Sequence, residues 1–535
     1  MLKKNRMNRV LQWALLGSLC VTPVLAQTEG EPQQGGTAII GLAAEPKGFN
    51  SALTSSTPDT VAGCMVYEGL LTIDTADGKD EISPLLAESW DVSDDGLTYT
   101  FHLREANWHD GQPFTSEDVR YTLEEVAAKF SPMFSAQVGT NLLKVETPDE
   151  RTAVIQLKQP YPTLLRTLNC TYSTPILPAH IFKGTDPATN PATTSEPVGT
   201  GPFKFESWQR GSHINLVRND DYWEEGKPYL DGLIIRALPN AASRIQALVA
   251  GEIDFIPMVH FPLNDARMVE ANPSLQIVRS GFAPGMTYAA FNLERAPLDD
   301  ARVRNALLMA TDRQFIHETA FSGFGDLGRA PWPSGIEWAA NPDVNYDVSN
   351  PYDPARAAAL LDEAGFVPGA DGTRFSVNII YDSAIAERNQ VANAIKANWG
   401  AVGVTVNLQP LEIAVVMPRV FQEHDFDIYL NDNNSYGDPA IGVGRVFVTD
   451  SIGRISGNAA QYSNPEVDSL FAAGAKEIDP AKRAEIYQSI QPILVRDMPV
   501  MMLHELSGFD GASRRLHGLW GWIGNGRWAH AWMDQ

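Results

Sequence analysis

Residues 285–313 read GMTYAAFNLERAPLDDARVRNALLMATDR, and this stretch changes character twice. β-branched and aromatic side chains over residues 287–293 predict a strand, and Pro297 closes the turn that follows it. Asp300 is then placed as the N-cap of a helix whose apolar face consists of Val303, Ala306, Leu307 and Ala310. A strand that passes directly into a capped helix indicates an α/β fold, in which one unit ends here and another begins.

Strands and helices alternate on both sides of this stretch. Downstream, strands are predicted at residues 375–381, 404–408 and 426–430, with helices between them at residues 387–399 and 413–422. This βαβαβ order predicts a parallel sheet. Upstream, a helix capped by Asn240 and ended by Gly251 separates strands predicted at residues 233–238 and 253–256, which predicts a second α/β unit.

A further helix and strand are predicted near the end of the chain. A helix at residues 480–496 precedes a predicted strand at residues 499–505, and we interpret that strand as the second crossing. Residues 509–535 are predicted to be a tail with four tryptophans. After the last parallel strand, residues 431–439 read NDNNSYGDP and predict a polar loop that is dense with hydrogen-bonding groups.

Composition limits the possible functions. A chain of 535 residues is too long for one core and is expected to divide into two or three domains. Its hydrophobic content of 44% and charged content of 20% are ordinary for a globular protein. The formal net charge of −24 disfavours binding to nucleic acids and to anionic lipids.

The first 26 residues differ from the rest of the chain. An apolar run at residues 11–25 follows four basic residues, which are Lys3, Lys4, Arg6 and Arg9. The run ends in small residues before Gln27 and is too short to span a membrane comfortably. This pattern predicts a signal peptide that is cleaved after Ala26, and therefore export to the periplasm.

Two cysteines, Cys64 and Cys170, follow the predicted leader. They could form one disulfide bond in an oxidising compartment, or they could be buried as small apolar residues. Spacing alone does not decide between these alternatives, because pairing depends on the fold.

We found no catalytic motif in the sequence. A Gly-x-Ser-x-Gly nucleophile elbow is missing, and His504-Glu505 lacks the second histidine of a zinc-protease helix. The ten histidines show no metal-ligand spacing, and no cofactor motif is present, so we expect neither metal nor cofactor. The missing catalytic motifs speak against a secreted hydrolase, which is the alternative to a binding protein.

Four strings carry a resemblance to a known family: YEGL at residues 67–70, SPLLAESW at 83–90, WHDGQPFTSEDV at 108–119 and GTGPFKFESW at 199–208. The chain resembles the large extracytoplasmic solute-binding proteins of ABC transporters, in the family of dipeptide-, oligopeptide- and nickel-binding proteins (solute-binding family 5). The resemblance implies a two-lobed α/β periplasmic binding protein fold of type II, with an extra α+β domain inserted in the first lobe. Two strand crossings would form its hinge.

The resemblance also predicts how the chain divides into domains. Lobe I is expected to comprise residues 37–60, 198–286 and 505–535. Residues 61–197 are expected to form the extra domain, and residues 287–504 to form lobe II. The lobes would close on a small solute, which the chain would deliver as a monomer to the permease subunits of the transporter in the membrane.

An ungapped comparison with the peptide binders of the family predicts the ligand contacts. These are Ser55, Thr57, Tyr288, Asn433, Asn434, Ser435, Tyr436, Asp438 and His504. Trp332 and Trp338 are added because amphipathic rings on a loop rich in Pro and Gly make good cleft walls. Core packing is the alternative for both tryptophans, and helix capping is the alternative for Asp438.

One position departs from the peptide binders. In them, an aspartate four residues before the proline of the Gly-Asp-Pro motif binds the α-ammonium of the peptide, whereas this chain has Ser435 four residues before Pro439. We therefore expect weak binding of unblocked dipeptides, and we expect a modified peptide, an opine-like conjugate or an oligosaccharide as the solute. Asp432 or Asp438 would supply the missing charge if the loop were shifted.

Overall fold

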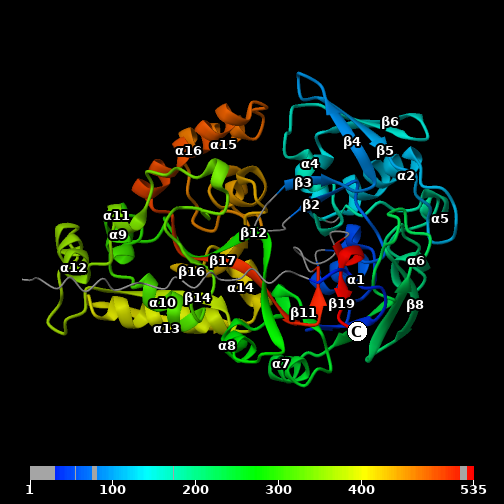
Figure 1. The fold of residues 1–535 in the computed structure, drawn as a ribbon. Coiled ribbons are helices and arrows are strands. Elements are labelled where there is room, and N and C mark those ends of the chain that lie inside the picture. Colours follow the sequence, from blue (N-terminus) through cyan, green and yellow to red (C-terminus); the bar gives the residue numbers. More distant parts are fainter. Residues whose placement is uncertain (1–29, 55, 75–80, 173, 519–526) are drawn as a thin grey trace, which may run out of the picture. The chain divides into compact units, whose positions relative to one another are not determined.

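Two long antiparallel strands, β12 (Leu275–Phe291) and β17 (Val500–Ser513), lie side by side in the middle of the largest sheet (Figure 1). The sheet has eleven strands in the order β15-β14-β16-β12-β17-β11-β1-β10-β9-β8, and β13 (Asp326–Leu327) pairs with β17. Because β12 and β17 each contribute to both halves of this sheet, they are the two crossings between the lobes.

The computed structural model describes residues 30–54, 56–74, 81–172, 174–518 and 527–535, and residues 33–535 form one unit. The predicted leader lies outside the described residues. Within the described residues, no helix is both long enough and apolar enough to cross a membrane.

On one side of the crossings, the sheet is built from the predicted βαβαβ unit. Strand β14 (Phe375–Asp382) pairs in parallel with β15 (Val404–Leu411) and with β16 (Ile428–Asn434), and β16 pairs with β12 in the antiparallel sense. Helices α13 (Ala386–Gly400) and α14 (Ile413–Phe421) connect the three strands. This arrangement confirms the predicted parallel sheet.

On the other side, β1 (Thr37–Leu42) lies between two parallel neighbours, β10 (Gly232–Ala237) and β11 (Phe255–Ile256). Antiparallel strands β9 (His213–Arg218) and β8 (Phe203–Gln209) extend the sheet to its edge. The predicted α/β unit around Asn240 is therefore present, but β1 is inserted between its two strands.

Residues 71–157 contribute two smaller sheets. One is the hairpin of β2 (Leu71–Asp74) with β3 (Glu81–Pro84). The other is a four-stranded antiparallel sheet in the order β4 (Ala87–Val92), β5 (Thr98–Leu103), β7 (Thr152–Leu157) and β6 (Leu142–Asp149). Near the C-terminus, β18 (Leu516–His517) pairs with β19 (Trp532–Met533).

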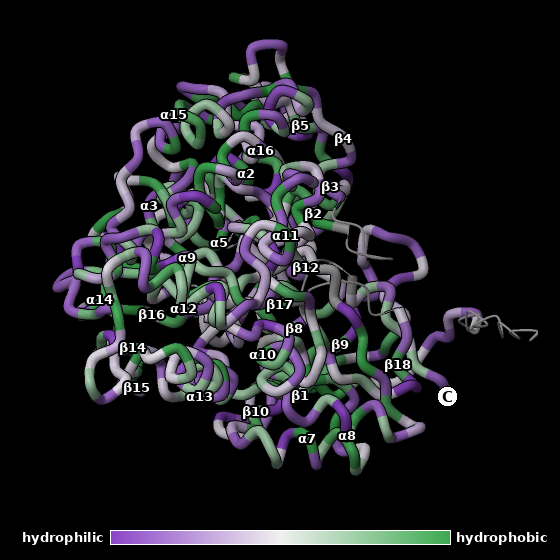
Figure 2. The backbone as a smooth tube through the Cα atoms, turned by 90° about the vertical axis from the view of Figure 1, so that its left-hand side faces the viewer, coloured by the Kyte–Doolittle hydropathy of each residue, from purple (hydrophilic) through white to green (hydrophobic). Residues whose placement is uncertain are grey.

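The remaining α-helices cover these sheets or connect their strands. They are α1 (Thr57–Gly63), α2 (Ser116–Arg120), α3 (Ala128–Phe130), α4 (Leu164–Thr167), α5 (Ala179–Phe182), α6 (Pro191–Thr194), α7 (Ala241–Val249), α8 (Ala266–Glu270), α9 (Ala301–Met309), α10 (Arg313–Ala320), α11 (Tyr346–Ser349), α12 (Pro354–Glu363), α15 (Pro465–Gly474) and α16 (Pro480–Asp497). Figure 2 shows hydrophilic and hydrophobic residues alternating along the described part of the chain, as expected for amphipathic elements that each bury one face.

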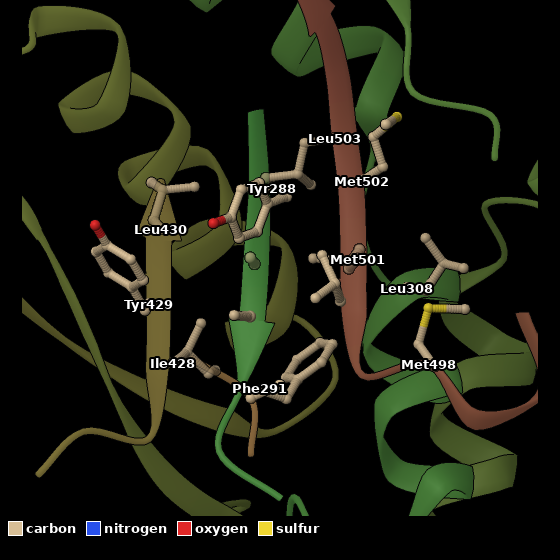
Figure 3. Packing of buried hydrophobic residues seen from close by; sticks show 14 of the residues in the cluster. Tyr288, Phe291, Leu308, Ile428, Tyr429, Leu430, Met498, Met501, Met502 and Leu503 are labelled. Carbon is tan, nitrogen blue, oxygen red and sulfur yellow. The ribbon is translucent and has the colours of Figure 1, made fainter. Parts of the chain in front are cut away.

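The predicted capped helix is α9. The Asp300 side chain accepts a hydrogen bond from the backbone N–H of Arg302 at 2.8 Å. The apolar face of the helix is buried, with Val303, Ala306 and Leu307 all at 0% exposure. Figure 3 shows how β12, β16 and β17 bring Tyr288, Phe291, Ile428 and Met501 together beside this helix. The crossing strands are therefore also part of the core of lobe II.

Three segments differ from the predictions for the same reason. Strand β12 begins twelve residues earlier than the predicted strand, β16 continues to Asn434, and β17 continues to Ser513. The first part of the predicted polar loop is therefore strand, and the predicted tail begins inside a strand. In all three cases, backbone pairing with neighbouring strands extends the strand through residues of low β-propensity.

A disulfide bond joins Cys64 to Cys170, with their Cα atoms 5.7 Å apart. The fold thereby decides between the two alternatives that the sequence left open. Cys64 caps the end of α1, and Cys170 lies in a 3₁₀ turn, Cys170–Tyr172. The bond therefore closes a long loop that contains both smaller sheets.

Removing this bond is expected to destabilise the protein. The two cysteines are 106 residues apart, so the bond restricts a large part of the unfolded chain. The double variant Cys64→Ser/Cys170→Ser should lose about 2–5 kcal/mol of unfolding free energy, measured by guanidinium denaturation. Wild-type protein treated with a reductant serves as the control and should match the variant. An unchanged denaturation midpoint in both samples would contradict the prediction.

Candidate solute-binding site

The polar segment at the end of β16 has two parts. Asn431, Asp432, Asn433 and Asn434 are strand residues that pair with β12, from Tyr288 to Gly285. The chain then turns through Tyr436 and Gly437, whose φ angles of 55° and 71° are left-handed. The segment therefore leaves the sheet next to the first crossing strand and turns sharply.

Asp438 follows the turn and is held by an arginine that is distant in the sequence. Its two carboxylate oxygens accept hydrogen bonds from Arg483 Nη1 and Nη2, each at 2.8 Å. Both side chains are buried, at 4% and 9% exposure. Asp438 also accepts from the N–H of Ala440 at 2.9 Å and caps the helical turn Pro439–Val443. Its predicted alternative role, helix capping, is therefore confirmed.

Asp432 is also paired. Its carboxylate accepts hydrogen bonds from the Thr287 hydroxyl at 2.7 Å and from Arg388 Nε at 3.0 Å. Arg388 lies on α13, and its side chain is only 7% exposed. Each aspartate of the polar segment is therefore already neutralised by an arginine of lobe II.

Uncharged side chains of the segment also hold the turn together. Asn433 Nδ2 donates to the Gly442 carbonyl at 2.7 Å, and its Oδ1 accepts from Arg445 Nη2. Asn434 Oδ1 accepts from the Tyr436 N–H at 2.8 Å, and Ser435 is fully buried. These contacts fix the backbone of the turn.

The turn contacts the inserted segment, residues 61–197, which is predicted to form the extra domain. The Tyr436 carbonyl accepts hydrogen bonds from Arg166 Nε at 3.2 Å and from the Tyr172 hydroxyl at 2.9 Å. The rings of Tyr172 and Tyr436 lie 5.2 Å apart. Arg483 Nη2 also donates to the Thr163 hydroxyl at 3.2 Å. The structure therefore brings the polar segment to a contact between the inserted segment and lobe II.

The predicted residues on the crossing strands are buried. Tyr288 is 2% exposed, and Asn431 Nδ2 lies 3.3 Å from its hydroxyl oxygen. His504 is fully buried and stacks on Phe321, with ring centroids 3.7 Å apart. Its Nε2 lies 2.9 Å from the Phe324 carbonyl. Burial and the neighbouring His317 lower the pKa of His504 to about 3.

The other predicted solute contacts are Ser55, Thr57, Trp332 and Trp338, and they do not lie together in one element. Thr57 begins α1, and Ser55 lies outside the described residues. Trp332 is 1% exposed and packs near Phe471, which agrees with the core-packing alternative. Trp338 is 36% exposed and lies over the Arg483 guanidinium at 4.9 Å. Trp338 is joined to the polar segment through Arg483, which also binds Asp438.

The arginines that contact the polar segment could not be identified from the sequence. Arg166, Arg388, Arg445 and Arg483 all contact the polar segment, yet each comes from a different part of the chain. No local motif identifies them, because an arginine on a helix is ordinary in sequence and gains its partner only through the fold. In the part of the chain that the structure describes, no group of His, Cys, Asp or Glu side chains could hold a metal ion.

Glu505 is a buried acid on the second crossing strand. It is 3% exposed and accepts hydrogen bonds from the Ser334 N–H at 2.9 Å and from the Ser334 hydroxyl at 2.7 Å. Burial raises the pKa of Glu505 from 4.5 to about 7, against the opposing effect of the Ser334 hydrogen bonds. The folded protein therefore keeps this carboxyl protonated at pH values at which the unfolded chain ionises it.

This difference predicts a pH dependence of stability. From pH 4.5 to 7, the unfolded chain releases the Glu505 proton first, so rising pH favours unfolding. The Glu505→Gln variant retains an acceptor for Ser334 but does not ionise. Compared with this variant, the wild type should lose a few kcal/mol of unfolding free energy across the window, since one pKa unit is about 1.4 kcal/mol. Urea denaturation at several pH values measures the difference. Parallel stability curves would contradict the prediction.

Comparisons with known proteins agree with this architecture. Residues 81–451 match the family model of bacterial extracellular solute-binding proteins, family 5 Middle. Heme-binding protein A of Haemophilus influenzae is 31% identical over 514 residues, which cover 92% of this chain and 91% of that protein.

Solved structures are similar over almost the whole chain. The ABC transporter substrate-binding protein CtaP from Listeria monocytogenes has a TM-score of 0.81 and 25% identity, and the match covers 94% of this chain and 100% of that one. AgaA from A. tumefaciens R10, in complex with agropinic acid, has a TM-score of 0.73 and 26% identity, with coverages of 94% and 99%. This chain therefore belongs to family 5 of the bacterial extracellular solute-binding proteins and is the substrate-binding component of an ABC importer.

Proposed function

We propose that this protein captures a small peptide-like or opine-like solute between its two lobes and delivers it to the permease subunits as a soluble periplasmic monomer. Cleavage of the leader after Ala26 would release it. The observation that carries the proposal is the pair of crossing strands, because β12 and β17 each contribute to both halves of the main sheet. Bending at two such strands lets two lobes close on a ligand without other covalent connections.

We also propose the domain division that the sequence predicts. Lobe I comprises residues 37–60, 198–286 and 505–535, the extra domain comprises residues 61–197, and lobe II comprises residues 287–504. The separate four-stranded sheet supports the extra domain. Both boundaries between the lobes, 286/287 and 504/505, fall inside the crossing strands.

The proposed solute contacts are the predicted ones: Ser55, Thr57, Tyr288, Trp332, Trp338, Asn433, Asn434, Ser435, Tyr436, Asp438 and His504. The observed contacts support some of these residues more strongly than others. It is strongest for the polar segment, whose turn contacts the extra domain through Tyr436. Side chains from both lobes meet there, as a closing binding site requires.

The state of the two aspartates supports a solute without a free α-ammonium. Asp438 is bound by Arg483 and Asp432 by Arg388, and Ser435 stands where the peptide binders carry their aspartate. A buried ammonium without a carboxylate partner would lose several kcal/mol to desolvation. Agropinic acid, with which AgaA was solved, and haem, which the Haemophilus influenzae relative is named for, show that chemistry other than simple peptides occurs in related proteins.

Two alternative functions would give different results in binding and mass-spectrometry experiments. An oligosaccharide-binding protein of the same fold would bind sugars and neither peptide-like nor opine-like solutes. A secreted hydrolase would change its substrate. We propose that the protein is not an enzyme, and mass spectrometry of a solute recovered after binding tests this: the mass should be unchanged.

A comparison of matched solutes tests the proposed class. We expect an N-acetylated dipeptide or agropinic acid to bind at least about tenfold more tightly than the unblocked dipeptide, which is about 1.4 kcal/mol, because the ammonium has no available carboxylate. Isothermal titration calorimetry measures the affinities. An unblocked dipeptide that binds as tightly as its acetylated form would overturn the proposed class, and binding of sugars alone would favour the first alternative.

Closure is tested separately. Small-angle scattering should show a smaller radius of gyration with the tightest solute of the screen than without it. An unrelated solute at the same concentration is the control. Because the solute binds only the folded chain, it should also raise the unfolding free energy by about 2.7 kcal/mol at a hundredfold excess over its dissociation constant. Binding without compaction would contradict the hinge model.

A further inference from the structure

The inserted segment, residues 61–197, meets the polar turn and α16 at one place apart from the crossing strands. The Tyr436 carbonyl accepts hydrogen bonds from the Tyr172 hydroxyl at 2.9 Å and from Arg166 Nε at 3.2 Å. Arg483 Nη2, on α16, donates to the Thr163 hydroxyl at 3.2 Å. We call these five residues the insert contact.

The insert contact is buried. Thr163 and Tyr172 are each 1% exposed, and the rings of Tyr172 and Tyr436 lie 5.2 Å apart. Tyr172 also packs with Ile73 and Ile441 in a small apolar cluster, against which Tyr436 lies. Hydrogen bonds in such surroundings are costly to leave unmade, because a buried donor or acceptor then lacks both water and a partner.

Both sides of the insert contact are held by other parts of the chain. Arg483 binds both carboxylate oxygens of Asp438, and its Nε donates to the Gly474 carbonyl at 2.8 Å. Tyr172 lies in the same 3₁₀ turn as Cys170, which is bound in the disulfide. Because the partners are already positioned, little further conformational entropy is lost when they meet.

The covalent path between the two sides runs through the crossing strands. Tyr436 and Arg483 lie in residues 292–499, which come after β12 and before β17, whereas the inserted segment precedes β12. If one half of the main sheet rotates relative to the other at the crossing strands, the hydrogen bonds of the insert contact must break. These hydrogen bonds therefore exist in one arrangement of the halves and are lost in the other.

We propose that the insert contact is a latch that holds the two lobes closed. The inference rests on the proposed function, because it assigns a role to residues in the closure of the solute site. The free energy of the latch belongs to the closed state alone, so it raises the closed fraction and thereby the affinity for the solute. Thr163 and Tyr172 are positioning residues in this role, and neither is among the proposed solute contacts.

The latch is tested first without any solute. The double variant Thr163→Val/Tyr172→Phe removes two hydrogen bonds of the insert contact and keeps the shape of both side chains. We expect the variant to have a larger radius of gyration than the wild type in small-angle scattering, because its closed state is less stable. Equal radii of gyration would overturn the latch.

Tyr67→Phe is the matched control. The Tyr67 hydroxyl also donates to a backbone carbonyl at 2.9 Å, but its partner Ala192 lies in the same inserted segment. Like Tyr172, Tyr67 is buried. Tyr67→Phe should therefore lower the unfolding free energy, measured by urea denaturation, and leave the radius of gyration unchanged. An equal expansion in this control would show a merely structural effect and would also overturn the latch.

The rate at which a bound solute leaves provides the second readout, with agropinic acid and an N-acetylated dipeptide as the probes. Each removed hydrogen bond should raise the dissociation rate in surface plasmon resonance by about two- to tenfold, with a smaller change in the association rate. A wild-type dissociation rate in the double variant would contradict the latch. If the wild type binds neither probe, the proposed solute class fails, and scattering without solute still decides whether the latch exists.

Discussion

The antiparallel ladder between β12 and β17 is the constraint on which the rest of the structure depends. It runs from Leu275 opposite Ser513 to Ala290 opposite Val500, and its register shifts between Ser280 and Gly285. On one side of this shift β12 pairs with β16, and on the other side β17 pairs with β11. A register irregularity weakens the ladder locally and allows strands to bend. The ladder thus joins the two halves of the main sheet, and the register shift marks a place where its strands can bend.

The side chains of the polar segment make contacts that fix its conformation. Its amides and aspartates satisfy the turn and two buried arginines. A buried ion pair of this kind adds little net stability compared with apolar residues, but removing one partner is costly. The arginines therefore fix the conformation of the segment and neutralise both of its carboxylates.

The inserted segment also makes contacts outside its own sheets. Thr163, Arg166 and Tyr172 contact Arg483 and Tyr436, so parts of the chain that are far apart in sequence meet at a place apart from the crossing strands. The disulfide bond from Cys64 to Cys170 ends two residues before Tyr172 and fixes this part of the segment to α1. These parts of the chain are therefore joined at this contact as well as through the crossing strands.

The sequence by itself determined the elements whose signals are local. Asp300 and Asn240 cap the predicted helices, and the three parallel strands lie near their predicted positions, because capping and hydrophobic periodicity act within a few residues. Tertiary structure alone decided where β12, β16 and β17 end, since pairing extends them beyond residues of high β-propensity. It also decided the disulfide pairing and the partners of Asp432 and Asp438. Arg483 is 45 residues from Asp438, and no local pattern can report a contact that exists only after the chain has folded.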